Sequence, residues 1–246
     1  MYKKNKILVI IPARGGSKGI FKKNIQQLGG RPLVEWSVLA AKYSKYVDCI
    51  HVSTDDFEIS QISIGSGATN PFLRPIEISQ DNSKTNEAIL FSIESFEKLG
   101  YVFDLVIELQ PTYPFRLNGL IDKCIEAYFE KDKINSLITI VKIETTQHKD
   151  FSISLNKNKL INFNKIPTEF RRQTLTPEFS CHGICICSNV KYLKKSGNTL
   201  DPNKTIGFLI DNKIIETDIN DNFDLFYANS IIQFNQISIE DLKNVK

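Results

Sequence analysis

The 246-residue sequence lacks several features that would assign it quickly to a class of protein. No apolar run approaches the about 20 residues that span a membrane. The N-terminal stretch MYKKNK is basic, but only five apolar residues follow it before Pro12, too few for a signal peptide. The net charge of +3 is too small to predict binding to nucleic acid. We therefore expect a cytoplasmic protein whose partners are neither membranes nor nucleic acids.

Two common phosphate-binding motifs are also missing. The chain has no G-x-x-x-x-G-K-[ST] sequence, which excludes a Walker A loop, and no G-x-G-x-x-G fingerprint of dinucleotide binding. It also has no repeat, low-complexity tract or long linker. Hydrophobic content of 41% and charged content of 24% are ordinary for a globular protein. The length therefore predicts one large α/β domain with room for a small insertion.

Cysteine is scarce and gives no pattern of structural bridges. The five cysteines are odd in number and scattered, so reduced thiols are the simplest interpretation. Cys181, His182, Cys185 and Cys187 are four possible zinc ligands within seven residues. Structural zinc sites usually combine two separated ligand pairs, and no second pair is evident. Cys185 and Cys187 alternate in an expected strand, so small buried thiols are favoured over a zinc site.

The stretch from Ile7 to Asn24, ILVIIPARGGSKGIFKKN, is the most informative part of the chain. Its first five residues are apolar and predict a strand buried on both faces, as in parallel sheets. Three glycines follow among several cations, and glycine lets successive backbone N–H groups approach a bound anion closely. Cations beside such a loop predict a polyphosphate site. The alternative is an ordinary solvated basic loop.

Apolar periodicity alternates between strands and helices along most of the chain. The expected strands are 7–11, 49–53, 105–109, 137–141, 183–187 and 205–210. The expected helices are 33–43, 57–64, 85–99, 117–129 and one from about 222 to 234. This rhythm predicts a parallel sheet with helices on both faces. The tail 235–246 is expected to be loosely held.

The rhythm changes after Lys142. Segments 151–155 and 159–163 are predicted to be two short strands around an Asn-Lys-Asn turn, an antiparallel hairpin. Such an insertion can serve as a lid or as a contact between subunits. The predicted division is a main domain of 1–142 with 183–246 and an inserted element of 143–182.

Polar segments follow three of the expected strands directly. They are the glycine-rich loop, residues 54–56 and residues 110–112. In an open parallel sheet, ligands bind beyond the carboxyl ends of the strands. We therefore expect these three segments to meet at one edge of the sheet.

Six motifs follow one another along the chain. They are IPARGGSKGIFKKN (11–24), VSTDD (52–56), PFLRP (71–75), LQPTYPFR (109–116), RRQ (171–173) and TDINDNFDL (217–225). This ordered set resembles that of the acylneuraminate cytidylyltransferases, the CMP-sialic acid synthetases, from about residue 7 to residue 234. The resemblance implies a Rossmann-like, three-layer α/β/α nucleotidyltransferase fold with a mostly parallel sheet. It also implies a homodimer built on the small antiparallel insertion, and a requirement for Mg²⁺.

The resemblance implies a reaction as well. Enzymes of this family couple CTP to a nine-carbon 2-keto sugar acid. The anomeric hydroxyl attacks the α-phosphorus, and pyrophosphate leaves in line. Charge builds on phosphate oxygens, so catalysis is expected to depend on positioning and on cations.

Single residues can be matched to the family's functional positions. The matches to nucleotide-binding positions are Arg14, Gly15, Gly16, Ser17, Lys18, Lys23, Asn24, Arg74 and Thr85. On the sugar side, Gln110 and Arg172 match, and His182 stands among positions that line the sugar. Arg14, Lys23 and Asp218 are expected to be catalytic, and Asp218 with Asn220 or Asp221 to hold the metal. An arginine offers a planar bidentate clamp, whereas a lysine offers a mobile point charge.

Two departures from the family pattern matter. The family usually shows two acids one residue apart near its C-terminus, whereas here Asn220 and then Asp221 follow Asp218. An Asn carbonyl can ligate Mg²⁺ weakly, or Asp221 supplies the charge. Residues 179–183 and Ile186 also differ from the sialic acid enzymes on the sugar side. The sugar acid is therefore expected to be a relative of N-acetylneuraminate, such as a legionaminate- or pseudaminate-type acid.

Two other functions remain open. One is a degenerate relative that binds nucleotide or sugar without turnover, a regulatory protein, which only Asn220 favours. The other is a cytidylyltransferase for an eight-carbon keto acid, whose first loop lacks the GGSKG run of this chain. The matched cations and Asp218 favour the catalytic interpretation.

Several matched residues have a structural alternative. Arg74 lies between prolines and could brace its loop, and Arg116 is expected to anchor the segment that follows it. Asp55 and Asp56 stand at a helix start, where aspartate is favoured as an N-cap. Capping competes with metal binding at Asp218 too.

The two other histidines give weaker indications of a role at the site. His148 and Lys149 lie near a position where the family has a cation beside the sugar, but they fit a surface pair as well. His51 falls in an expected strand and is predicted to be structural.

Overall fold

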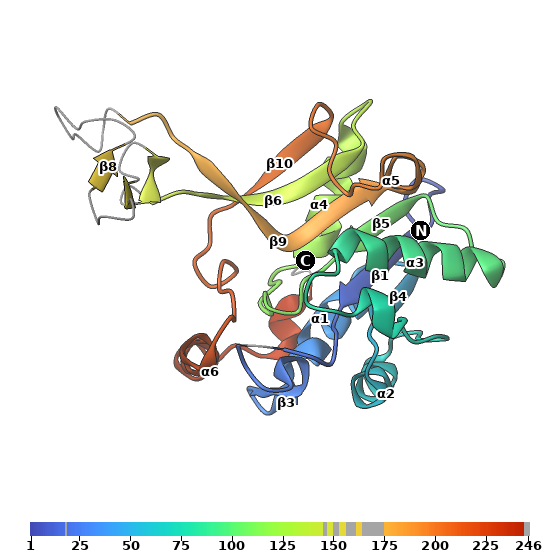
Figure 1. The fold of residues 1–246 in the computed structure, drawn as a ribbon, viewed down its shortest axis with the longest axis horizontal. Coiled ribbons are helices and arrows are strands. Elements are labelled where there is room, and N and C mark those ends of the chain that lie inside the picture. Colours follow the sequence, from blue (N-terminus) through green and yellow to red (C-terminus); the bar gives the residue numbers. More distant parts are fainter. Residues whose placement is uncertain (18, 145–146, 150–152, 156–160, 164–174, 244–246) are drawn as a thin grey trace.

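The computed structural model describes residues 1–17, 19–144, 147–149, 153–155, 161–163 and 175–243. The main sheet has six strands in the order β10-β6-β9-β5-β1-β4 (Figure 1). These are β1 (Ile7–Pro12), β4 (Cys49–Ser53), β5 (Leu105–Glu108), β6 (Ser136–Lys142), β9 (Phe179–Asn189) and β10 (Thr205–Ile210). Neighbouring strands are parallel, except that β9 runs antiparallel to β5 and β6. The mostly parallel sheet is confirmed, but the sequence pattern predicts neither the direction nor the 11-residue length of β9.

Helices lie on both faces of this sheet. They are α1 (Leu33–Lys42), α2 (Phe57–Ser66), α3 (Thr85–Lys98), α4 (Leu120–Glu130), α5 (Val190–Ser196) and α6 (Asn222–Asn235). Three short 3₁₀ turns are η1 (Lys23–Ile25), η2 (Ile76–Ile78) and η6 (Ile239–Leu242). Two short strands, β2 (Gln27–Leu28) and β3 (Arg31–Pro32), form a small hairpin before α1.

Alternate residues of β1 point into two separate hydrophobic cores. Ile7, Val9 and Ile11 belong to the larger core, which includes residues of α1 and α4. Leu8 and Ile10 belong to the smaller core, which includes residues of α3 and α5. A strand that is buried on both faces needs apolar residues at every position, which explains the continuous run from Ile7 to Ile11. This arrangement confirms the three-layer α/β/α fold.

Helices α2 and α4 show how local chemistry sets where a helix begins or ends. Asp56 caps α2 by accepting the N–H of Ile59 at 3.0 Å, and Gly67 ends it with a φ of 118°. The prediction that α4 begins at 117 is wrong, because the helix begins at Leu120. Asn118 and Gly119 have φ values of 55° and 64°, which an α-helix cannot contain.

The C-terminal tail is better held than its composition predicts. The N–H groups of Asn118 and Gly119 donate to the carbonyls of Asp241 and Leu242. Leu242 is only 2% exposed and lies in the larger core. The expectation of a loose tail is therefore wrong as far as residue 243, and 244–246 lie outside the described residues.

The predicted hairpin is present as β7 (Ile153–Leu155) and β8 (Ile161–Phe163). The two strands pair antiparallel, with Ile153 opposite Phe163. Figure 1 shows the hairpin standing apart from the main sheet, beyond the ends of β6 and β9. The turn between the strands lies outside the described residues.

Among the residues that the structure describes, no helix combines the length and apolar character needed to cross a bilayer.

Candidate active site

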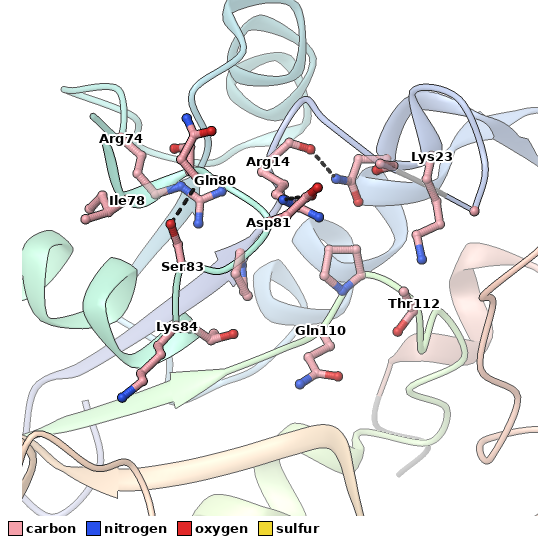
Figure 2. Close-up of a pocket in the computed structure, with 17 residues that line it drawn as sticks. Arg14, Lys23, Arg74, Ile78, Gln80, Asp81, Ser83, Lys84, Gln110 and Thr112 are labelled. Carbon is pink, nitrogen blue, oxygen red and sulfur yellow. Dashed lines mark hydrogen bonds and ion pairs between the residues drawn. The ribbon is translucent and has the colours of Figure 1, made fainter. Parts of the chain in front are cut away.

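A cavity of about 340 Å³ opens where β1 and β5 end and α3 begins (Figure 2). Three segments form its walls: the loop after β1, the segment before α3 and the loop after β5. The lining residues are Pro12, Arg14, Ser17, Gly19, Lys23, Asn24, Arg74, Ile78, Ser79, Gln80, Asp81, Ser83, Lys84, Thr85, Gln110, Pro111 and Thr112. The predicted meeting of the loops after β1 and β5 at one edge is confirmed.

The segment after β4 meets the same loop from behind the cavity. Asp55 accepts the N–H of Gly15 at 2.9 Å, and a Cβ on Gly15 would come within 2.9 Å of Asp56. The capping alternative is confirmed for Asp56. Asp55 instead fixes the backbone of the glycine-rich loop, so both acids support the site without lining the cavity.

The glycine-rich loop is folded back on itself and against the C-terminal motif. Asn24 donates from its side-chain amide to the carbonyl of Arg14 at 2.9 Å. A Cβ on Gly19 would lie 2.4 Å from the carbonyl oxygen of Asn220, so only glycine fits there. Nothing lies within 4 Å of the Cβ position of Gly16. Lys18 lies outside the described residues.

Four cations line the cavity, and they differ in how they are paired. The Arg14 guanidinium forms an ion pair with Asp81 at 2.7 Å, shown as a dashed line in Figure 2. Lys23 donates from Nζ to the carbonyl of Ile219 at 3.1 Å. Burial lowers the pKa of Lys23, while the charge of Asp218 acts in the opposite direction. Lys84 lies beside the first turn of α3.

Arg74 is the cation whose environment points most clearly to a ligand. It is only 8% exposed, yet its Nε and Nη2 atoms have no hydrogen-bond partner among the residues that the structure describes. Burial lowers the pKa of this guanidinium. Only its backbone N–H braces the loop, by donating to Thr54 at 2.7 Å. A buried guanidinium without partners costs free energy unless something else binds it.

The C-terminal motif reaches the cavity through backbone contacts. The N–H of Ile219 donates to the carbonyl of Thr112 at 2.9 Å. This contact places Asp218 beside Tyr113, whose pKa is raised by burial and by the charge of Asp218. The Oδ2 atom of Asp218 accepts the side-chain amide of Asn220 at 3.0 Å, whereas Oδ1 is buried without a hydrogen-bond partner among the described residues.

The two other acids of this motif are used for helix capping. Asp221 accepts the N–H groups of Phe223 and Asp224 at the start of α6. Asp224 accepts the N–H groups of Asn220 and Asp221 in return, which completes a capping box. Among the proposed metal ligands, Asp218 is the residue with a buried carboxylate oxygen that has no hydrogen-bond partner among the described residues. No group of three or more His, Cys, Asp or Glu side chains in the described residues forms a metal site by itself.

Of the predicted sugar-side residues, Gln110 lines the cavity, whereas His182 is not among the lining residues. Gln110 packs directly on Gly183, where a Cβ would lie 2.2 Å from its side-chain carbon. The ring of His182 lies 5.6 Å from that of Tyr113, its Nδ1 atom has no partner, and its Nε2 atom lies 3.0 Å from the Ser180 hydroxyl. Arg172 lies outside the described residues.

Arg116 confirms the structural alternative given for it. It is 1% exposed and donates to the carbonyls of Gln110, Tyr113 and Ile184 and to the Ser37 hydroxyl. Burial lowers its pKa to about 10. Arg116 therefore holds the loop after β5 in place from its buried side.

The cysteines and the remaining histidines are mostly structural. Cys185 and Cys187 are buried as predicted, but Cys181 is exposed. His51 is 1% exposed, and burial lowers its pKa to about 4, so the structural prediction is confirmed. His148 and Lys149 both pair with Glu178. Lys149 is exposed, whereas His148 is only 5% exposed. The description as a surface pair therefore fits Lys149 but not His148.

Sequence reasoning missed Asp81, Lys84 and Tyr113. Asp81 and Lys84 belong to the polar run SQDNSKT before α3. A polar run that leads into a predicted helix at the carboxyl edge of a sheet could have indicated them. Tyr113 gives no comparable signal, because its role depends on a contact with Asp218 across 105 residues of chain.

Comparisons with known proteins agree with this geometry. A family model described as cytidylyltransferase matches residues 8–195. The CMP-N,N'-diacetyllegionaminic acid synthase of Legionella pneumophila is 36% identical over 123 residues, which cover 50% of this chain and 53% of that protein. The pseudaminic acid cytidylyltransferase of Campylobacter jejuni is 28% identical over 233 residues, which cover 95% and 99%.

Two further similarities extend the same pattern. The N-acylneuraminate cytidylyltransferase of Oncorhynchus mykiss is 40% identical over 111 residues, which cover 45% of this chain and 24% of that protein. A solved structure of CMP:2-keto-3-deoxy-manno-octonic acid synthetase complexed with CTP superimposes with a TM-score of 0.69 at 13% identity. It covers 94% of this chain and 99% of that chain, and at such low identity it shows the shared fold alone.

Proposed function

The chain belongs to the cytidylyltransferase family, and we propose that it couples CTP to the anomeric hydroxyl of a nine-carbon 2-keto sugar acid. The products are a CMP-sugar and pyrophosphate. The observation that carries this proposal is a pair of buried groups without hydrogen-bond partners among the described residues: the Arg74 guanidinium, which lines the cavity, and the Oδ1 atom of Asp218, whose neighbour Ile219 is bonded to the lining residue Thr112. A cation and an anion that both lack partners fit a ligand that brings phosphates and a metal ion together.

The cavity walls support the nucleotide half of the reaction. Arg14, Lys23 and Arg74 surround one space with Ser17 and Thr85. The triphosphate is negatively charged, so these cations bind it and stabilise the charge that develops on its oxygens. The sugar oxygen forms a bond to the α-phosphorus while the bond to the β-phosphate breaks. Lys23 is placed to follow the moving phosphate, because a lysine ammonium is a compact point charge on a flexible stem.

Magnesium fits the uncommitted side of Asp218. Mg²⁺ is commonly held by one or two carboxylates together with substrate phosphates, so a single free carboxylate oxygen suffices. Asp218 with Asn220 would hold it, and when bound it supplies positive charge to the phosphate oxygens. Asp221 is less suited, because its Oδ1 atom accepts two N–H groups of α6. The matched family region ends at residue 195, so the role of Asp218 rests on the geometry.

The sugar half of the reaction is assigned to Gln110, His182 and Arg172. Relatives named for legionaminic and pseudaminic acids favour an acid of that type over N-acetylneuraminate. The eight-carbon alternative has support only from a fold similarity at 13% identity. Turnover is favoured over the regulatory alternative, because the catalytic cations and Asp218 are all present.

Assembly and location complete the proposal. An isolated two-stranded hairpin is marginally stable in water, so β7 and β8 gain by packing against a second copy. We assign 143–182 to a homodimer contact and 1–142 with 183–246 to the catalytic domain. All five cysteines are free, which suits work in the cytoplasm, where CTP is available.

Pyrophosphate release tests the proposal directly. The assay contains the protein, Mg²⁺, each of the four nucleoside triphosphates in turn, and a panel of legionaminic, pseudaminic, N-acetylneuraminic and eight-carbon keto acids. We expect release with CTP and at least one nine-carbon acid. Tight CTP binding without release would favour the regulatory alternative, and release with the eight-carbon acid alone would contradict the proposed sugar class.

A further inference from the structure

Glu108 is the acidic residue of the main sheet, and nothing in the reaction proposed above uses it. No other Asp or Glu occurs in the six strands of that sheet. Glu108 ends β5 and lies opposite Ile10 of β1 and Ile186 of β9. It is only 4% exposed. A buried acid in an otherwise apolar central strand is unfavourable unless it has a role.

Other buried acids show what a structural role looks like in this protein. Asp122 accepts the Ser44 hydroxyl and the N–H of Lys45. Asp201 accepts the side chain of Asn135 at 2.7 Å and the N–H of Asn203 at 2.8 Å. Each of these acids is held by a backbone N–H and a second donor, so each ties two segments together.

Glu108 is held quite differently. Within the described residues it is hydrogen-bonded to the side chain of Gln110, whose Nε2 donates to Oε1 of Glu108 at 3.3 Å. No cation and no backbone N–H is paired with it there. Burial raises the pKa of Glu108, and the Gln110 hydrogen bond opposes this effect only in part. The acid therefore contributes little to holding the sheet together.

Gln110 itself is confined on two sides. Its amide lies against Gly183, with Oε1 and Nε2 at 2.3 and 2.5 Å from where a Cβ would be. Its Nε2 atom is engaged by Glu108, and the residue lines the cavity. An amide has one donor end and one acceptor end. With one N–H of Nε2 donated to Glu108, the Oε1 acceptor and the second N–H of Nε2 are left for a ligand.

We propose that Glu108 is a positioning residue that fixes the Gln110 amide so that its carbonyl oxygen faces the sugar acid. This inference rests on the proposed function, since it assigns Gln110 to the sugar. A carbonyl oxygen accepts a hydrogen bond, so the Oε1 atom of Gln110 recognises an N–H or O–H group of the sugar acid. An acylamido N–H is a group of this kind.

Three variants test this assignment. Glu108→Leu removes the acceptor, Glu108→Gln keeps the shape and one carbonyl acceptor, and Asp122→Leu is the control at a buried acid far from the cavity. We expect Glu108→Leu to raise KM for the sugar acid by about fivefold, the value of one hydrogen bond, with KM for CTP unchanged. Glu108→Gln should recover most of this loss.

Stability separates positioning from a structural role. Glu108→Leu replaces a poorly paired buried acid with an apolar side chain, so its melting temperature should be equal to or higher than that of the wild type. Asp122→Leu should melt lower, with both KM values unchanged. A lower melting temperature for Glu108→Leu with an unchanged KM for the sugar would overturn the inference.

A measurement without turnover keeps the inference separate from the proposed function. The side-chain amide of Gln110, assigned by comparison with Gln110→Ala, is followed by hydrogen exchange in ¹⁵N-labelled protein. We expect protected amide protons in the wild type and faster exchange in Glu108→Leu. If no sugar acid is turned over, the proposed function fails, and this exchange measurement still decides the inference. Equal protection in both proteins contradicts it.

Discussion

Two buried arginines near the cavity, Arg116 and Arg74, have opposite environments. Arg116, below the loop after β5, donates to three carbonyls and one hydroxyl. Arg74, in the segment before α3, has two nitrogens without partners. Both side chains are more than nine-tenths buried. Burial alone therefore does not distinguish a structural arginine from a binding one, whereas the count of satisfied donors does.

The same distinction applies to the acids near the C-terminus. Asp221 and Asp224 cap α6, while Asp218 keeps one buried oxygen without a partner. All three side-chain nitrogens of Arg116 donate hydrogen bonds within the protein. Arg74 and Asp218 keep buried polar atoms without partners among the described residues, and we propose that a ligand binds them. The following variants are ways to test this division.

The largest effect on stability is expected at Arg116. Arg116→Leu leaves three buried carbonyls and the Ser37 hydroxyl without their donor, so the free energy of unfolding should fall by about 3–5 kcal/mol. Urea denaturation measures this change. A variant as stable as the wild type would show that Arg116 does not hold the loop.

Lys23 should affect turnover more than stability. Lys23→Ala removes a cation beside the reacting phosphates, and kcat should fall by about 100-fold or more. Lys22→Ala is the matched control, because Lys22 is the neighbouring lysine and pairs with Glu58 at 2.6 Å away from the lining residues. Similar losses in both variants would contradict a specific role for Lys23.

Arg74 should affect nucleotide binding with no loss of stability. Arg74→Met keeps the apolar stem and removes the unpartnered guanidinium, so KM for CTP should rise about tenfold, the value of a charged hydrogen bond. The free energy of unfolding should stay the same or increase. If Arg74→Met unfolds as readily as Arg116→Leu while binding CTP normally, Arg74 braces its loop instead.

Asn220 should have the smallest effect. Asn220→Asp gives the motif a second acid, separated from Asp218 by one residue. A carboxylate is a stronger ligand for a hard cation than an amide carbonyl is. Activity should be equal to that of the wild type or up to about twofold higher. Strong inactivation, seen in the same pyrophosphate assay, would mean that the amide itself is needed, for example to donate to Asp218 as it does at 3.0 Å.

Sequence reasoning predicted the fold well where local pattern decides it. The apolar run of β1 and the glycine-rich loop after it are both local signals, and both lie where expected. The direction of β9 could not be predicted, because it depends on pairing with β5 and β6, which lie far away in the chain. The start of α4 was misjudged, since two left-handed residues precede it.

The candidate site shows the same limit. The motifs indicated Arg14, Lys23 and Gln110, which line one cavity. They could not indicate which of Asp218 and Asp221 caps α6, because that depends on the residue at which the helix begins. They also could not indicate the ion pair between Arg14 and Asp81, which joins loops 67 residues apart. Long-range pairing, and not residue type, decides these cases.

The central claim is that Asp218 recruits magnesium to a triphosphate held by the cavity cations. The most direct test is a Mg²⁺ titration of pyrophosphate release in the wild type, Asp218→Asn and Asp221→Asn. Asparagine caps helices as well as aspartate does, so the Asp221 variant keeps its fold. We predict that Asp218→Asn alone lowers turnover and requires more Mg²⁺ for half-maximal rate. An unchanged Mg²⁺ requirement in Asp218→Asn would contradict the account.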